Sequence, residues 1–121
     1  MTMTQVDSWF CIPSTMHFSM IKKIRHIDDL MLDDITLRRM VERVFEEFRW
    51  EVKFNSMNDI ISIDFTGEQY GNDKDFLDMI APFVENESYI ELDFEDGSCA
   101  RWEFDGNECN EKIGRYEKVW E

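Results

Sequence analysis

The sequence predicts an α+β fold, in which an antiparallel β-sheet of about five strands packs against two or three α-helices. Apolar residues recur at helical spacing in the first half of the chain, and runs of alternating apolar and polar residues dominate the second half. Hydrophobic residues make up 43% of the 121 positions, which is enough to bury a core without disulfides. We expect one domain over residues 1–121, helical over about 14–49 and rich in sheet over about 50–121.

The N-terminal residues predict a short strand followed by a helix. Residues 9–13 (WFCIP) are an apolar run that ends at a proline, which suits an edge strand because its missing N–H is not needed on the open side. Between Ser14 and Met31, apolar residues follow at spacings of three and four, which predicts a helix. Its exposed side carries a basic cluster whose role the sequence leaves open: Lys22, Lys23 and Arg25.

A second helix is indicated more strongly. Its apolar stripe has the spacing of one helix face and consists of Leu37, Met40, Val41, Val44, Phe45 and Phe48. Capping residues are available at Asp33, Asp34 and Thr36. Two alternating runs, residues 50–54 and 61–65, then predict a hairpin. A helix of about ten residues should follow, with Asn72 or Asp73 as its cap.

The last third predicts a C-terminal β-meander, with turns at Asp96-Gly97 and Asp105-Gly106. A two-residue first turn would set Leu92 opposite Arg101 and mix charge into an apolar face. A three-residue turn with a left-handed Gly97 instead pairs Leu92 with Ala100, and also Ile90 with Trp102, so we predict this bulged turn.

The second turn and the chain end complete the predicted meander. A two-residue loop at Asp105-Gly106 sets Trp102 opposite Cys109 and keeps that face apolar. Tyr116, Val119 and Trp120 are candidates for a final strand.

The chain is strongly acidic, with 13 Lys and Arg against 27 Asp and Glu and a net charge of −14. Residues 85–121 hold 12 of the acidic and 4 of the basic residues, so the charge is densest there. Because this field repels phosphates and anionic lipid, we expect no direct nucleic-acid binding, no membrane binding, and a basic protein surface as partner. Without a targeting signal or a long apolar run, we expect a cytoplasmic protein; its oligomeric state stays open.

No catalytic, metal-binding or cofactor-binding motif is recognisable, so we expect a protein that is not an enzyme and has no cofactor. His17 and His26 have no zinc-ligand spacing, and the three cysteines form no CxxC pair. An alternative is a metal-dependent enzyme that uses outward-facing carboxylates of the sheet, with these candidates: Asp64, Glu91, Asp93 and Glu103. That design also needs a nearby lysine, which is missing at the required spacing.

The meander is the predicted binding surface. Alternation places Glu91, Asp93 and Glu95 on one face about 6.7 Å apart, close to two phosphate steps of a nucleic-acid strand. Such a face would fit a groove built for phosphate, although an acidic face that only keeps the protein soluble has the same pattern. The predicted partner-binding residues are Tyr89, Glu91, Asp93, Glu95, Asp96, Glu103 and Asp105.

Four segments of the last third carry a resemblance: FLDMIAPFVE at 76–85, SYIE at 88–91, EDG at 95–97 and RWEFDG at 101–106. Through them, residues 73–121 resemble a small family of bacterial and mobile-element proteins without an assigned activity, and the resemblance implies no site residues. In size and acidity alone, the chain is similar to anti-CRISPR proteins, to other phage-encoded DNA mimics and to immunity proteins.

The leading hypothesis is therefore an acidic inhibitor that binds a nucleic-acid-handling defence protein, such as a nuclease or a CRISPR effector. An immunity protein or antitoxin that neutralises a toxin is the alternative, because it would use the same electrostatic attraction.

Overall fold

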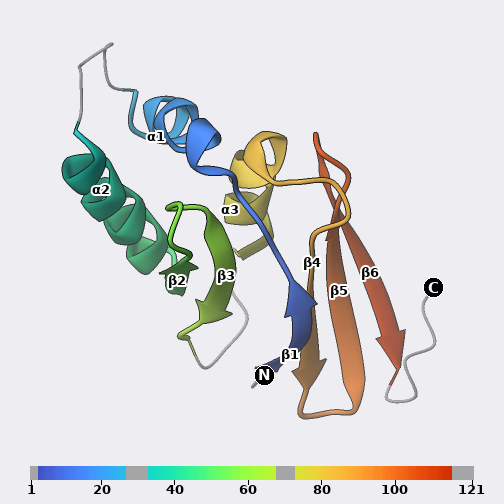
Figure 1. Cartoon of the computed structure of the whole chain (residues 1–121). Coiled ribbons are helices and arrows are strands. Elements are labelled where there is room, and N and C mark those ends of the chain that lie inside the picture. The colour runs from blue at the N-terminus through green and yellow to red at the C-terminus, as the bar shows by residue number, and fades with distance from the viewer. Residues whose placement is uncertain (1–2, 27–32, 68–72, 116–121) are drawn as a thin grey trace.

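The computed structural model describes residues 3–26, 33–67 and 73–115, which form three α-helices and six β-strands (Figure 1). In chain order these are β1 (Met3–Trp9), α1 (His17–Arg25), α2 (Asp34–Glu47), β2 (Trp50–Phe54), β3 (Ile60–Phe65), α3 (Asp73–Ile80), β4 (Tyr89–Phe94), β5 (Ser98–Phe104) and β6 (Cys109–Arg115). The predicted α+β class is confirmed. Among these residues, no helix is both long and apolar enough to cross a membrane.

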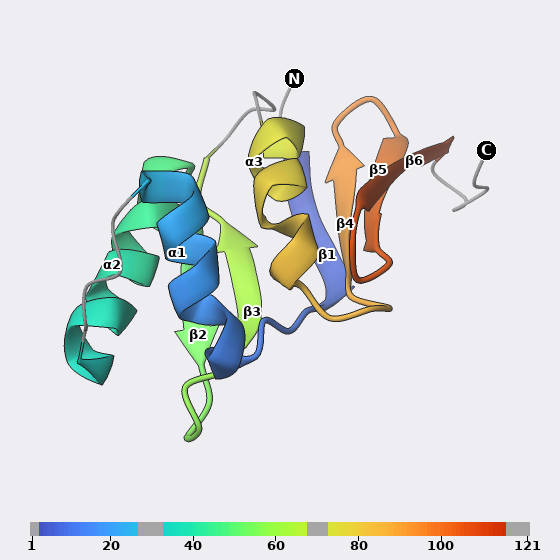
Figure 2. The same cartoon turned by 90° about the horizontal axis from the view of Figure 1, so that it is seen from above.

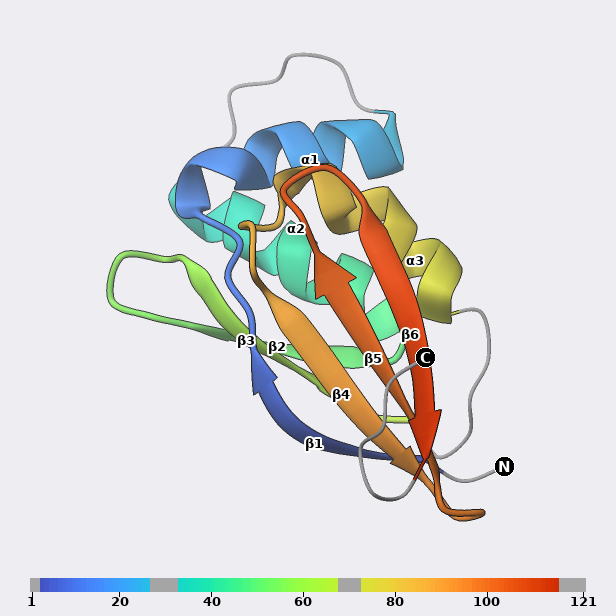
Figure 3. The same ribbon diagram turned by 90° about the vertical axis from the view of Figure 1, so that its right-hand side faces the viewer.

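The strands form two antiparallel sheets. One has four strands in the order β1-β4-β5-β6, and the other is the β2-β3 hairpin. All three helices lie behind the four-stranded sheet when it is viewed as in Figure 3, and α1 and α2 lie beside the hairpin in Figure 2. The opposite face of the four-stranded sheet is the one turned toward the viewer in Figure 3.

A glutamine side chain joins the two sheets between β1 and β3. Gln5 donates through Nε2 to the carbonyl of Ile63 at 2.8 Å and accepts through Oε1 from the backbone N–H of Phe65 at 2.9 Å. The joint continues at an antiparallel bridge between Ile12 and Ile60, whose backbone N–H groups and carbonyls bond at 2.9 and 3.0 Å. The amide of Gln5 thus takes the place of a strand's peptide group, and the six strands act as one curved layer.

Aromatic packing fills the core behind this layer. Trp50 of the hairpin and Trp102 of the four-stranded sheet are both fully buried, with ring centroids 6.3 Å apart. On the helical side, Phe76 of α3 stacks on Phe48 at 4.4 Å and meets Phe45 of α2 edge-on at 5.1 Å. The apolar stripe predicted for the second helix therefore does face the core.

The predicted first turn of the meander is confirmed. Gly97 has a φ of +85°, and its N–H bonds to the carbonyl of Phe94. Leu92 pairs with Ala100, and Ile90 pairs with Trp102. The left-handed conformation that this register requires is one that glycine adopts without steric cost.

The predicted second turn is wrong by two residues. Phe104, and not Trp102, lies opposite Cys109, so the loop has four residues, 105–108. The carboxylate of Asp105 explains the longer loop, because it accepts the N–H groups of Asn107 at 2.9 Å and Glu108 at 2.7 Å. A shift of two residues keeps every side chain on its predicted face, and Cys109 stays buried.

Two predictions at the N-terminal end need correction. The first strand is β1, Met3–Trp9, and not residues 9–13; it does lie at an edge of the sheet, but Phe10 and Ile12 enter the core. The first helix ends at Arg25, well short of Met31, because His26 caps it in a left-handed conformation with a φ of 54°.

Some predicted features fall outside the described residues. These are residues 27–31 of the first helix, the helix cap at Asn72, and the final strand with Tyr116, Val119 and Trp120. Residues 14–16 form a short 3-10 turn that leads into α1.

The joint between the sheets predicts that Gln5→Ala lowers the stability of the protein. The substitution leaves the Phe65 N–H and the Ile63 carbonyl without their partner, so the free energy of unfolding should fall by about 2 kcal/mol. Urea unfolding followed by circular dichroism measures this change. Thr66→Ala, at an exposed position just after the same strand, is the control and should change it by less than about 0.5 kcal/mol. Equal effects of the two substitutions would contradict the joint.

His17 predicts a pH dependence of stability. It is 3% exposed, its Nε2 lies 3.0 Å from the carbonyl of Ile12, and burial lowers its pKa below 6.5 more than this carbonyl and Asp59 raise it. The unfolded chain therefore binds a proton first as the pH falls, and the stability that depends on neutral His17 is complete above about pH 6.5 and lost below it.

The measurement is the free energy of unfolding at several pH values between 5 and 8. His17→Phe should flatten its slope below pH 6.5 compared with the unchanged chain. His26→Asn, at an exposed histidine with a left-handed backbone, is the control and should keep the slope. The same slope in all three chains would show that His17 does not titrate in this way.

Candidate protein-binding site

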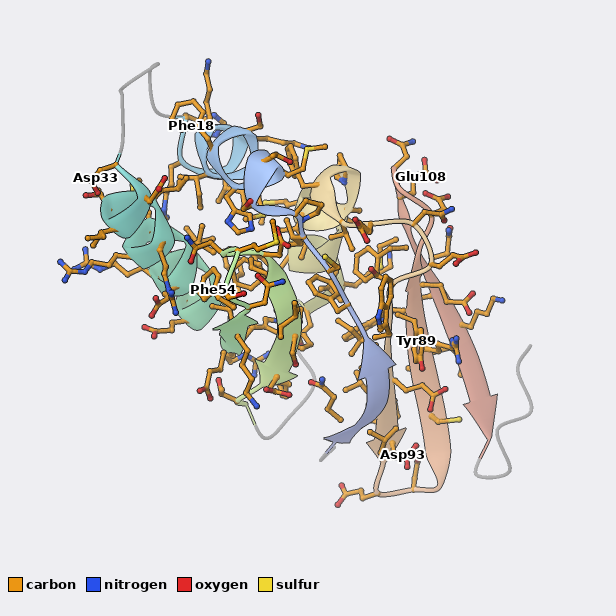
Figure 4. All side chains as sticks on the ribbon, in the orientation of Figure 1. Phe18, Asp33, Phe54, Tyr89, Asp93 and Glu108 are labelled. Atoms are coloured by element: carbon orange, nitrogen blue, oxygen red, sulfur yellow. The ribbon has the colours of Figure 1, made fainter. Side chains whose placement is uncertain are left out.

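The outer face of the meander is the face of β4, β5 and β6 that is turned away from the helices. Tyr89, Glu91 and Asp93 of β4 lie on it, as the alternation predicts, while Ile90 and Leu92 are buried on the inner face. Figure 4 shows Tyr89 and Asp93 on this sheet and Glu108 at one end of it, whereas Asp33 and Phe54 belong to the other half of the molecule.

An arginine neutralises the centre of this outer face. Arg101 of β5 lies opposite Glu91 in the register, and its Nη1 is 3.0 Å from Glu91 Oε1. Its Nε is 2.8 Å from Glu103 Oε2, too poorly aligned for a hydrogen bond, and its guanidinium lies 4.0 Å from the centroid of the Tyr89 ring. Glu91 is only 13% exposed, so its carboxylate is largely covered.

Lys112 of β6 adds a second positive charge. Its Nζ is 2.8 Å from Glu103 Oε1, so the two oxygens of Glu103 contact two different cations. The hydrogen bond from Lys112 is the main cause that lowers the pKa of Glu103. The centre of the face is therefore a charge-balanced network and not the continuous acidic ridge that the sequence suggested.

Four exposed acidic residues lie at the loop end of the sheet, which carries the β5-β6 loop. We use "loop-end cluster" for four exposed residues from the β5-β6 loop and from the segment before β4: Glu85, Glu87, Asp105 and Glu108. A hydrogen bond of 2.9 Å from Glu87 N–H to the carbonyl of Phe104 holds the two segments together. Among the described residues, none of these four carboxylates forms an ion pair.

A hollow of about 280 Å³ connects the loop-end cluster to the balanced centre. Its lining residues are Glu87, Ser88, Tyr89, Arg101 and Glu103. Its lining therefore combines Glu87 of the loop-end cluster with the Tyr89 ring and with Arg101 and Glu103 of the balanced centre. This volume is near the lower end of the usual range for ligand pockets and suits one side chain of a partner.

The seven predicted binding residues do not form one cluster. Tyr89, Glu91 and Glu103 meet at the centre, Asp93 lies further along β4 opposite Cys99, and Asp105 belongs to the loop-end cluster. Glu95 and Asp96 lie in the opposite turn, where the hydroxyl of Ser98 and then its backbone N–H donate to Asp96 and lower the pKa of this carboxyl. At about 3.3 Å per residue, the seven residues of β5 separate these two ends by about 20 Å.

The sequence reasoning missed five residues of this surface: Glu85, Glu87, Arg101, Glu108 and Lys112. Arg101 had a signal, because the predicted register that pairs Leu92 with Ala100 also sets Arg101 opposite Glu91. Lys112 and Glu108 depend on the second turn, whose length was predicted wrongly. Glu85 and Glu87 come from a segment outside any predicted strand, so alternation said nothing about them.

The carboxylates of the alternative metal site are not gathered in one place. Asp64 lies on β3 of the hairpin, 3.4 Å from Lys53, whereas Glu91 and Glu103 lie on the four-stranded sheet. Within residues 3–26, 33–67 and 73–115, no group of three or more His, Cys, Asp and Glu side chains is placed to hold a metal ion.

The basic cluster of α1 lies against neighbouring elements. Arg25 Nη2 is 2.6 Å from Glu47 Oε2 of α2, and Lys23 Nζ lies 5.7 Å from the centroid of the Phe83 ring. These contacts account for two of its three side chains as packing between elements.

Comparisons of this chain with protein-family models, with curated proteins and with solved structures found no match.

Proposed function

We propose that this protein is a stoichiometric inhibitor that binds the basic, nucleic-acid-binding surface of another protein, such as a nuclease or a CRISPR effector. The observation that carries the proposal is the loop-end cluster, four exposed carboxylates without an ion pair among the described residues, next to a hollow that suits one side chain. Charges of this kind gain most from a cationic partner, because no neighbouring cation has to be displaced.

The overall field supports the same partner. A net charge of −14 attracts a basic protein over a long range and speeds the encounter, while it repels nucleic acid itself. The two acidic ends of the meander lie about 20 Å apart, which corresponds to about six phosphate steps along one strand. A groove that binds several consecutive phosphates would contact both ends, with the balanced centre between them.

The test reverses charge at the loop end of the sheet. One variant combines E85K, E87K and E108K, and a control variant makes the same change of net charge away from the outer face of the meander, on α2, β2 and α3, with E46K, E51K and D75K. Both sets of positions are exposed. The assay measures inhibition of purified bacterial nucleases and CRISPR effectors, together with capture of each enzyme by the tagged protein.

We expect the loop-end variant to weaken binding at least 100-fold, because three favourable charge contacts become repulsive, and the control variant to weaken it only a few-fold through the net field. Equal losses in both variants would remove the meander from the interface. Capture of a toxin without nucleic-acid-binding activity would point instead to an immunity protein.

The proposed binding should also depend on salt. Because salt screens the attraction between exposed charges, binding should weaken steeply between 50 and 200 mM salt.

A further inference from the structure

Arg101, at the centre of the outer face, lies among two carboxylates and an aromatic ring, which are groups that also bind arginine side chains between proteins. Arg101 contacts a carboxylate on either side, Glu91 at 3.0 Å and Glu103 at 2.8 Å, and its guanidinium lies over the Tyr89 ring at 4.0 Å. We call Tyr89, Glu91 and Glu103 the arginine cage. A guanidinium is flat and carries its donors in a fork, so it can lie over an aromatic ring and pair with carboxylates at the same time. An ammonium group cannot make both contacts equally well.

The cage opens to the surface. The Arg101 side chain is 27% exposed, and it shares the hollow of about 280 Å³ with Tyr89, Glu103 and Glu87. Glu87 also lines the hollow and forms no ion pair with another described residue, so its negative charge favours the approach of a second cation. A cationic side chain that enters the hollow therefore reaches the same ring and the same carboxylate that Arg101 contacts.

We propose that the arginine cage is a binding site for an arginine side chain of a basic partner, and that Arg101 occupies it in the free protein as an internal competitor. This inference rests on the proposed function and adds the chemistry of the partner to it. On binding, an incoming guanidinium replaces Arg101 on Tyr89 and Glu103, and the side chain of Arg101 turns away to solvent. Because one guanidinium replaces another, the contacts to Tyr89 and Glu103 are kept. A lysine cannot form both contacts, so the cage binds partners that present only lysine more weakly.

The experiment measures binding of a fluorescently labelled nona-arginine peptide by anisotropy at low salt. Arg101→Gln removes the internal competitor, so the variant should bind the peptide about tenfold more tightly than the unchanged chain. One cation–π contact or one charge-assisted hydrogen bond is strong enough to change the affinity by that factor. A nona-lysine peptide should gain at most threefold, because it cannot stack in the same way.

Arg38→Gln is the matched control. Arg38 also pairs with a glutamate, Glu42 at 3.4 Å, and lies over an aromatic ring, Phe54 at 4.3 Å, but it belongs to α2 in the other half of the molecule. Its loss changes the net charge by the same amount and should tighten peptide binding by less than twofold. Equal gains from the two substitutions, or equal gains for the two peptides, would overturn the proposal.

A measurement on the unchanged chain covers the case in which Arg101→Gln does not fold. In NMR spectra, the Nε–Hε signal of Arg101 should move toward that of a solvent-exposed arginine as nona-arginine saturates the protein. A signal that stays in place while the peptide is bound would overturn the proposal. Because the peptide is synthetic, these results do not depend on whether a nuclease is the natural partner, and the charge-reversal test of that partner does not depend on Arg101.

Discussion

The joint between the two sheets depends on the side-chain amide of Gln5, which bonds to the backbone of β3 as a neighbouring strand would. The amide of Gln5 gives β3 one acceptor and one donor, at 2.9 and 2.8 Å, where a neighbouring strand would give peptide groups. Without it, the hairpin would present an open edge to the four-stranded sheet, and buried peptide groups would lack partners. With it, Trp50 and Trp102 from the two sheets meet in one core. The curvature of this layer leaves the outer face of the meander uncovered by the three helices.

How far the sequence predicts this fold depends on the range of each interaction. Local patterns are reliable: the stripe of α2 and the left-handed Gly97 are read from a few neighbouring residues, and both predictions are confirmed. The joint at Gln5 is not predictable in this way, because its partners lie 58 and 60 positions along the chain. The strand β1 was misplaced for the same reason, since its pairing with β4 shows only after the whole chain has folded.

The site follows the same division. Alternation predicts that Glu91 and Asp93 lie on the outer face, but it does not predict which charged side chains lie next to them on the neighbouring strands. Cross-strand neighbours have Cβ atoms about 5 Å apart, so the pairing of β4 with β5 determines whether a carboxylate is exposed to a partner or neutralised by its neighbour. Arg101 and Lys112 neutralise the centre: the place of Arg101 follows from the first turn, which the sequence predicts, and the place of Lys112 from the second turn, which it does not.

This pairing also limits where a sheet can carry its binding charge. Like charges opposite one another destabilise adjacent strands, so the acidic residues of β4 and β5 need cations between them for the meander to form. Loops have no cross-strand neighbours, and carboxylates such as Glu87 and Glu108 remain there at little cost to folding. A strongly acidic sheet protein should therefore concentrate its unpaired charge at the ends of its strands. The loop-end cluster lies where this constraint expects unpaired charge, and the basic partner that we propose would approach the molecule from that end.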